Sequence, residues 1–371
     1  MSQSSLYEYY KSSKKYDLEL LLCEDSKEAH ELESVAKFFK QETIVFPDFR
    51  PSFGDDLRVY KEELHQLFAQ LRTYYKAKTK PLIISPLKTL LFHLPHENLL
   101  QSITLEFGED IKLKNFKEQM LFWGYTFVDM VQVEGEISFR GDIIDIYVPY
   151  TNNPIRISLF DETIEQIKYF ELESQRTIGE ELSDFEVSSA FYSLDEDNFN
   201  TLNEKIETSE FDSMSKDIAS LGLWHLDELA SNFLDGKNTK LSRNLDSILV
   251  DAYGINNPQV SRACFDLESL PQSDDFKDLV VADVASLLKV HKNKKITIIA
   301  SNKAVMKQMG VFDLTNITQV YAPYILNIIS NDELVISLNK PEKKRRRRKS
   351  AILLDDLKKG DYVVHEDYGV G

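Results

Sequence analysis

The chain has 371 residues, of which 42% are hydrophobic and 28% are charged, as is ordinary for soluble globular proteins. A chain of this length can form about two or three domains with hydrophobic cores. Its two cysteines, Cys23 and Cys264, lie far apart, and its longest apolar stretches have the length of strands. Residues 1–17 are polar. A disulfide framework, a membrane-spanning helix and a secretory signal are therefore not expected, and a cytoplasmic protein fits the composition.

The net charge is −17, and it hides a stronger acidity. Seven consecutive cations occupy residues 343–349, and without them the net charge is −24. A body this acidic repels phosphate, which disfavours sequence-independent DNA binding by the folded part. The basic run is typical of a solvated linker. A phosphate-seeking arm on nucleic acid is the alternative, although no aromatic side chains are interleaved with the cations for base stacking.

The first part of the chain alternates strands and helices. Residues 18–23 form an apolar strand, and Asp25 and its neighbours can cap a helix over about 27–40. A second amphipathic helix is predicted over 58–76, a second strand over 81–85, and a further helix through His93. This order predicts an α/β layer with a mainly parallel sheet.

The pattern changes after Trp123. Short strands and tight turns between 128 and 170 predict a small, mainly antiparallel domain. Helical sequence is predicted from 195 to 234, followed by another α/β unit over 276–338 whose clearest strands are 296–300 and 334–338. The segment from 357 to 371 begins a further strand-rich unit and stops early, so the chain resembles part of something longer.

Motifs for catalysis are missing from the sequence. The Gly236–Lys237 pair lacks the second glycine and the hydroxyl residue of a phosphate-binding loop. His93 and His96 could share a helix face, but no third metal ligand accompanies them. Cys23 lies inside an apolar strand, where a free cysteine is usually a packing residue. No catalytic residue, cofactor site or metal site is predicted for this chain.

Two predicted strands of the antiparallel domain carry cations and an aromatic ring on one face. In residues 155–160, alternation directs Ile155, Ile157 and Leu159 one way and directs Arg156, Ser158 and Phe160 the other way. In residues 136–140 it directs Ile137 and Phe139 inward, and Glu136, Ser138 and Arg140 outward, before Gly141 permits a turn. Two arginines and an aromatic ring on an outer face are typical of a protein-interface hot spot. The alternative is that Phe160 turns back into the core and the arginines are simply solvated.

The sequence then resembles a known family over more than fifty residues. The segments GYTFVD at 124–129, GEISFRGDIID at 135–145, PIRISLFD at 154–161 and SQRT at 174–177 are similar to the UvrA-binding domain shared by the excision-repair subunit UvrB and the transcription-repair coupling factors (Mfd). The absence of a P-loop, and the lack of room for an aromatic hairpin after Pro47, favour the coupling factors. The VVHEDYGVG stretch at the end of the chain resembles the start of their RNA-polymerase-interacting domain.

This resemblance implies the fold and the domain organisation. We expect a degenerate UvrB-like, P-loop-NTPase-derived α/β scaffold with an inserted mainly antiparallel α+β domain and a further small α/β domain. The expected domains are 1–120 (domain 1a), 121–189 (UvrA-binding domain), 190–262 (domain 1b), 263–340 (small α/β domain), 341–356 (basic linker) and 357–371 (incomplete polymerase-interacting domain).

The resemblance also implies a function. Arg140, Arg156 and Phe160 match the family positions that contact UvrA, so this chain is expected to recruit UvrA to stalled RNA polymerase without being an enzyme itself. ATP, magnesium, DNA and the translocating motor are expected only in a full-length protein, and no membrane is implied. Two alternatives are a UvrB-like ATPase that binds damaged DNA, and a DNA-binding module that acts through the basic run.

Overall fold

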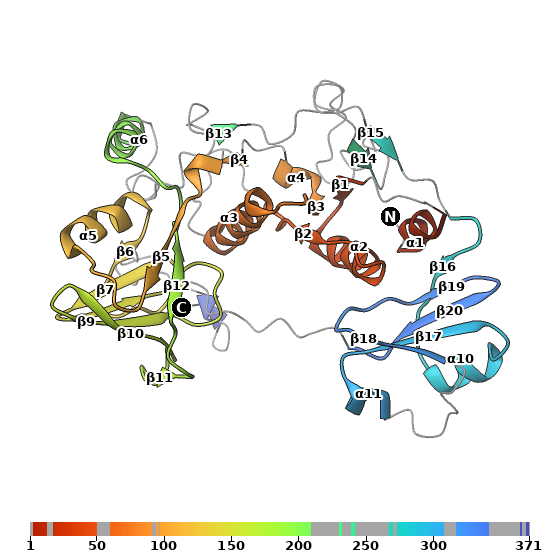
Figure 1. Ribbon diagram of the computed structural model, residues 1–371. Helices are drawn as coiled ribbons and strands as arrows, with labels where there is room; N and C mark the ends of the chain where they lie inside the picture. The colour runs from red at the N-terminus through yellow and green to blue at the C-terminus, as the bar shows by residue number, and fades with distance from the viewer. Residues whose placement is uncertain are drawn as a thin grey trace. The chain divides into compact units, whose positions relative to one another are not determined.

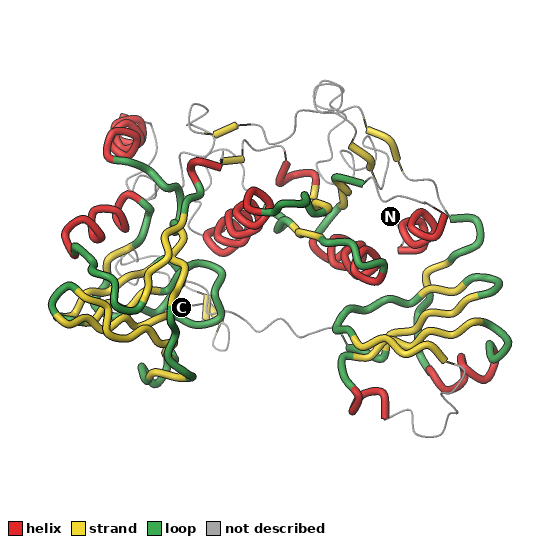
Figure 2. Tube along the Cα trace, in the orientation of Figure 1, coloured by secondary structure: helices red, strands yellow, loops and turns green. Residues whose placement is uncertain are grey.

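The computed structural model describes residues 3–12, 18–49, 60–90, 94–95, 97–208, 230–231, 239–241, 267–269, 273–307, 317–340, 364–365 and 369–370. The chain divides into two compact units, Met1–Lys340 and Pro341–Gly371. Figures 1 and 2 show several separate sheets with helices packed beside them, which is a mixed α/β architecture. Among the described residues, no helix is both long enough and apolar enough to cross a membrane.

The N-terminal layer is a parallel three-stranded sheet in the order β1-β3-β2, as the alternation of strands and helices predicted. Helix α2 packs on one face through Leu32 and Val35, and helix α3 packs on the other face through Leu67 and Phe68. Asp25 caps α2 as predicted, because its side chain accepts a hydrogen bond from the Glu28 amide at 2.8 Å. The elements are β1 (Leu20–Cys23), α2 (Ser26–Phe38), β2 (Thr43–Val45), α3 (Lys61–Lys76), β3 (Leu82–Pro86) and α4 (Leu87–Leu90).

The predicted antiparallel domain is a six-stranded sheet in the order β11-β10-β9-β8-β7-β6. Strands β7 to β11 pair antiparallel, and only the edge pair of β6 and β7 is parallel. Apolar side chains from alternate positions of β7 to β10 form one core with helix α5. The elements are α5 (Leu113–Phe122), β6 (Thr126–Phe127), β7 (Glu136–Arg140), β8 (Ile143–Ile146), β9 (Ile155–Phe160), β10 (Thr163–Phe170) and β11 (Thr177–Ile178).

A separate antiparallel pair of strands carries the chain into and out of this domain. Strand β5 (Ser102–Glu106) pairs with β12 (Asp184–Ser188), and Figure 1 shows the two side by side. Leu105, Phe116 and Met120 belong to the same hydrophobic core as the six-stranded sheet. Hydrophobic packing therefore groups β5 and α5 with the antiparallel domain, whereas the sequence prediction assigned residues up to 120 to the first domain.

The α/β unit predicted over 276–338 is a five-stranded sheet in the order β16-β19-β20-β17-β18. Helix α1 packs between this unit and α2, and its Lys11 pairs with Glu333 at 2.8 Å. The elements are α1 (Gln3–Ser12), β16 (Lys277–Asp278), α10 (Val284–Val290), β17 (Lys295–Ala300), α11 (Lys303–Lys307), β18 (Ile317–Tyr321), β19 (Ile328–Ile329) and β20 (Glu333–Ser337).

Shorter elements complete the described chain. Helix α6 falls where helical sequence was predicted after residue 195. The remaining elements are β4 (Leu94–Pro95), the 3-10 helix η2 (Glu97–Leu99), α6 (Glu196–Thr208), β13 (Ala230–Ser231), β14 (Thr239–Leu241), β15 (Leu267–Ser269), β21 (Val364–His365) and β22 (Gly369–Val370). Several features of the sequence analysis lie outside the described residues, among them the helical sequence from 209 to 229, the Gly236–Lys237 pair, Cys264, the basic run at 343–349 and the histidines His93 and His96.

Candidate protein-docking site

The outer face of the six-stranded sheet carries the predicted site residues. Strand β9 alternates as predicted, with Ile155, Ile157 and Leu159 buried in the core and with Phe160 exposed on the other side. The register places Arg156 opposite Asp145 of β8. Asp145 lies in turn opposite Ser138 of β7. Neighbouring strands thus bring together residues that lie up to 18 positions apart in the sequence.

Asp145 joins the two predicted arginines. Its carboxylate is almost fully buried, with 1% of its side chain exposed. Arg156 donates to it twice, from Nε to Oδ1 at 2.7 Å and from the terminal nitrogen Nη2 to Oδ2 at 2.8 Å. Arg140 donates from its own Nη2 to the same Oδ2. Two guanidinium groups therefore share one carboxylate, and the cluster keeps a net charge of +1.

Arg156 has further partners within the domain. Its Nη1 donates to the Gln175 carbonyl at 3.0 Å, and its guanidinium lies over the Phe170 ring, 4.8 Å from the centroid. Gln175 has a positive φ of 55°, in the turn formed by the SQRT segment, and this turn delivers the carbonyl to Arg156. Hydrogen bonding to Asp145 raises the pKa of Arg156 above its ordinary value. Only 17% of the Arg156 side chain is exposed.

Arg140 and Phe160 are the solvent-facing part of this surface. The Arg140 side chain is 44% exposed even though it is paired, and Phe160 is 66% exposed. Both residues are the last of their strands and lie at the same end of the sheet, because Arg140 precedes the β7–β8 turn and Phe160 precedes the β9–β10 turn. Gly141 takes a φ of +59° in the first turn, as predicted. The alternative in which Phe160 folds back into the core is therefore wrong.

Three details differ from the sequence prediction. Arg156 lies on the outer face, but internal hydrogen bonds engage most of its donors, so it is not the freely solvated cation that alternation suggests. Ser138 is buried, because its hydroxyl donates to the Asp129 carbonyl at 2.9 Å. Ile143 pairs with Arg140 and is half-buried on the outer face. Sequence reasoning missed Ile143 and Asp145, although the alternation of IIDI in β8 carries the signal for both.

A second set of basic residues lies on helix α3, where His65 and Arg72 are buried and Lys61 is half-buried. Lys61, His65 and Arg72 follow one side of the helix, which the sequence analysis did not single out. The His65 ring nitrogen Nδ1 lies 3.6 Å from a carboxylate oxygen of Glu134, and Arg72 donates to the Ser189 carbonyl at 3.3 Å. Burial lowers the pKa of His65 to about 4, outweighing the opposite effect of Glu134. These contacts attach the antiparallel domain to α3.

The carboxyl end of β1 carries acidic groups. In nucleotide-binding α/β proteins this position, before the first helix, is where a glycine-rich loop holds phosphate. Here the Asp25 carboxylate caps α2, and the Glu28 side chain accepts from the Glu24 amide at 2.6 Å. Burial, reinforced by Glu28 and Asp25, raises the pKa of the Cys23 thiol. The amides of Glu24 and Glu28 already donate to carboxylates, and these carboxylates would repel an anion. This position therefore disfavours a phosphate group.

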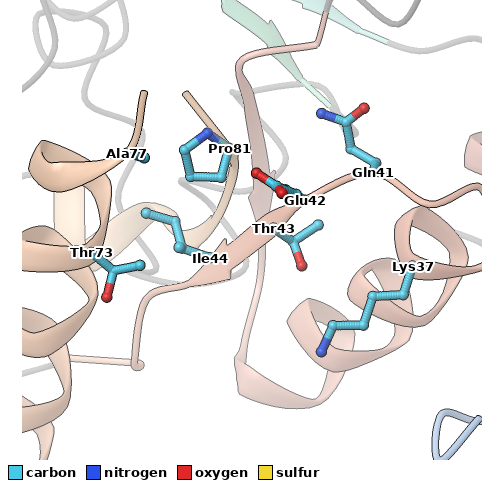
Figure 3. Close-up of a pocket in the computed structure, with 8 residues that line it drawn as sticks. All are labelled: Lys37, Gln41, Glu42, Thr43, Ile44, Thr73, Ala77 and Pro81. Atoms are coloured by element: carbon cyan, nitrogen blue, oxygen red, sulfur yellow. The ribbon is translucent and has the colours of Figure 1, made fainter. Parts of the chain in front are cut away.

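One surface pocket of about 320 Å³ lies at the opposite end of the same sheet (Figure 3). It opens between the C-terminal ends of α2 and α3 and the first residues of β2. Ligands of parallel α/β sheets bind at the carboxyl ends of the strands, so this pocket is at the wrong edge for such a site. Across the residues that the structure describes, no group of three or more His, Cys, Asp or Glu side chains could hold a metal ion.

Comparison with known proteins agrees with this geometry. The sequence model of the UvrB interaction domain family matches residues 103–191, the same span as β5 to β12. A transcription-repair-coupling factor of Helicobacter pylori (strain ATCC 700392 / 26695) is 38% identical over 379 residues, covering 100% of this chain and 38% of the relative. That of Helicobacter pylori strain J99 is 37% identical over the same span, and that of Bacillus subtilis is 35% identical over 100 residues, 26% of this chain and 8% of the relative.

The matched residues 103–191 contain the whole Arg140, Arg156 and Phe160 surface. Over its whole length the chain is similar to the transcription-repair-coupling factors of Helicobacter pylori. It spans about 38% of the length of the Helicobacter proteins that it matches.

Proposed function

We propose that this chain is the UvrA-recruiting module of a transcription-repair-coupling factor, and that the surface formed by Arg140, Arg156 and Phe160 binds UvrA. The observation that supports this most is Phe160, a benzyl side chain that is 66% exposed on the same sheet face as the paired but accessible guanidinium of Arg140. Large aromatic and arginine side chains that become buried on binding are the usual hot spots of protein interfaces.

The chemistry of the surface defines what the partner must offer. Arg140 suits a carboxylate on the partner, because its side chain is 44% exposed, only one of its nitrogens is engaged by Asp145, and charge-assisted hydrogen bonds are the strong ones. Phe160 needs an apolar pocket that removes its ring from water. Asp142, Asp161 and Glu162 are exposed in the two adjoining turns. A partner with a carboxylate and a pocket at its centre and cations around them fits this arrangement.

We infer that this chain neither binds nor hydrolyses ATP. Asp25 and Glu28 occupy the end of β1, where a phosphate-binding loop would lie in a P-loop-derived fold. The proposed origin of the scaffold from such a fold is consistent with its parallel three-stranded sheet. ATP, magnesium, DNA and RNA-polymerase contacts, and a cytoplasmic location, are proposed for a longer coupling factor of which residues 357–371 begin the polymerase-binding part.

The docking function is tested by isothermal titration calorimetry of the whole chain with UvrA. Phe160→Ala is expected to weaken binding about 30-fold or more, because truncating a hot-spot aromatic typically costs at least about 2 kcal/mol. Phe107→Ala is the matched control, since Phe107 is also exposed, at 59%, but lies after β5 rather than on the β9–β10 hairpin. Phe107→Ala is expected to keep the wild-type affinity.

Two results would contradict the proposal. The first is an absence of UvrA binding by the folded wild-type chain. The second is an equal loss for Phe160→Ala and Phe107→Ala, which would mean that exposed rings contribute without regard to their position.

A further inference from the structure

The Asp145 carboxylate is fully engaged by two cations. Its Oδ1 accepts from Nε of Arg156, and its Oδ2 accepts from both Arg156 and Arg140. Arg156 is fixed independently by the Gln175 carbonyl and the Phe170 ring. Arg140, by contrast, has Asp145 as its one side-chain partner among the contacts found in the described part of the chain.

We propose that Asp145 is a positioning residue that, anchored by Arg156, holds the Arg140 guanidinium in the orientation in which it binds the partner. This inference rests on the docking function proposed above, and it assigns different roles to the residues of the surface. The partner contacts are made mainly by Arg140 and Phe160, whereas Arg156 contributes a small exposed area and anchors Asp145.

Geometry and charge support this division. A guanidinium has five N–H donors, and Arg156 commits three of its nitrogens to internal acceptors, while Arg140 commits one. Arg156 therefore has little left for a partner, and Arg140 keeps most of its donors. Without the carboxylate between them, the two guanidinium groups would repel each other. Arg140, the last residue of β7, would then be free to sample other rotamers.

The arrangement also limits what the partner can be. The cluster of Arg140, Asp145 and Arg156 carries a net charge of +1 and exposes one guanidinium, so it is complementary to a single carboxylate rather than to a dense anionic surface. Preorganising a long side chain saves the entropy that its immobilisation would otherwise cost on binding. Asp145 is thus expected to increase affinity without touching the partner.

A double-mutant cycle in UvrA binding tests this role. Asp145→Asn is isosteric and removes the charge, and it is expected to weaken binding about three- to tenfold in the wild-type background, as loss of one preordered side chain does. In an Arg140→Ala background the same change is expected to alter affinity less than about twofold, because the group that it positions is gone. In a Phe160→Ala background the full loss is expected to persist.

Purely structural damage would behave differently. If Asp145→Asn lowers affinity equally with and without Arg140, the positioning role is overturned. Where Asp145→Asn does not stay folded at the assay temperature, Arg156→Lys replaces it, since lysine keeps the charge but loses the two-pronged contact with Asp145. Its loss of affinity must likewise disappear in the Arg140→Ala background. Failure of the wild-type chain to bind UvrA would instead overturn the docking function itself.

Discussion

Two groups of basic residues in this molecule use similar contacts for different purposes. On α3, His65 lies against Glu134 and Arg72 donates to Ser189, and both side chains are buried, so neither is accessible to a partner. On the six-stranded sheet, Arg156 and Arg140 both pair with Asp145, but Arg140 does so through one nitrogen only, and its side chain remains 44% exposed.

The difference shows that ion pairing does not by itself separate a structural cluster from a docking surface. A buried charged side chain must be fully satisfied, because each unmet hydrogen bond carries a desolvation cost. A docking side chain must be held in one orientation and must still have N–H donors that a partner can reach. Exposure that persists after pairing is therefore the more useful criterion, and three sets of measurements compare the two regions.

The largest effect is expected for Arg72→Ala on α3. Truncation removes a buried guanidinium, opens a cavity and leaves the Ser189 carbonyl without that donor, which together cost about 2–4 kcal/mol of unfolding free energy. Urea unfolding followed by circular dichroism measures it. Arg140→Ala on the outer face is the matched arginine control, and it is expected to change the unfolding free energy by less than about 1 kcal/mol. Equal losses for the two arginines would remove the distinction drawn between the regions.

A smaller effect is expected from pH. The pKa of His65 is about 4 in the folded chain against an ordinary value of 6.5, with Glu134, Lys61 and Arg72 facing the ring. The unfolded chain therefore takes up a proton between these values when the folded chain does not, and the free energy of unfolding falls as the pH drops from 6.5 towards 4. Between pH 7 and pH 5 the His65 contribution is roughly 2 kcal/mol.

Urea unfolding at pH 7 and at pH 5 measures this contribution by comparing the wild type with His65→Gln. The variant is expected to lose less stability over that interval than the wild type does. Identical pH dependence in the two proteins would show that His65 is not held neutral by burial.

The smallest effect separates two glycines with positive φ. Gly135 has a φ of +83°, and an added Cβ would lie 3.3 Å from Cε1 of His65. Gly141, beside Arg140, has a φ of +59° and nothing within 4 Å of an added Cβ. Gly141→Ala is expected to cost about 1 kcal/mol for the backbone alone, and Gly135→Ala about 2 kcal/mol because His65 must also move. Thermal unfolding of both variants provides the comparison, and a larger cost at Gly141 would contradict it.

Much of this arrangement could be predicted from local patterns. The alternation in residues 155–160 correctly predicted that Phe160 is exposed and that Ile157 is buried, because a period of two is a local property of a strand. The parallel N-terminal sheet followed from the alternation of strands and helices. The pairing of Arg156 and Arg140 through Asp145 could not be predicted, since it depends on the register between three strands.

The inward-facing basic residues of α3 were missed for a related reason. Lysine, histidine and arginine along a helix usually mark its solvated side, and only the docking of another domain turns that side inward. Hydrophobic periodicity identified Leu67 and Phe68 as core residues but carried no information about a second, polar contact surface. The contact with Glu134 and Ser189 joins residues more than 65 positions apart.

The pairing of β5 with β12 gives the antiparallel domain adjacent entry and exit points. Ser102 lies opposite Ser188, so the polypeptide enters and leaves the domain at adjacent points, as a loop inserted into its host would. Residues 101–190 could in principle be grafted between two neighbouring surface positions of an unrelated scaffold. The graft would keep Phe160 at the end of β9, and it would need a new covering for Glu134 and Ser189, which now contact α3, and for Phe122, which now packs against Phe199.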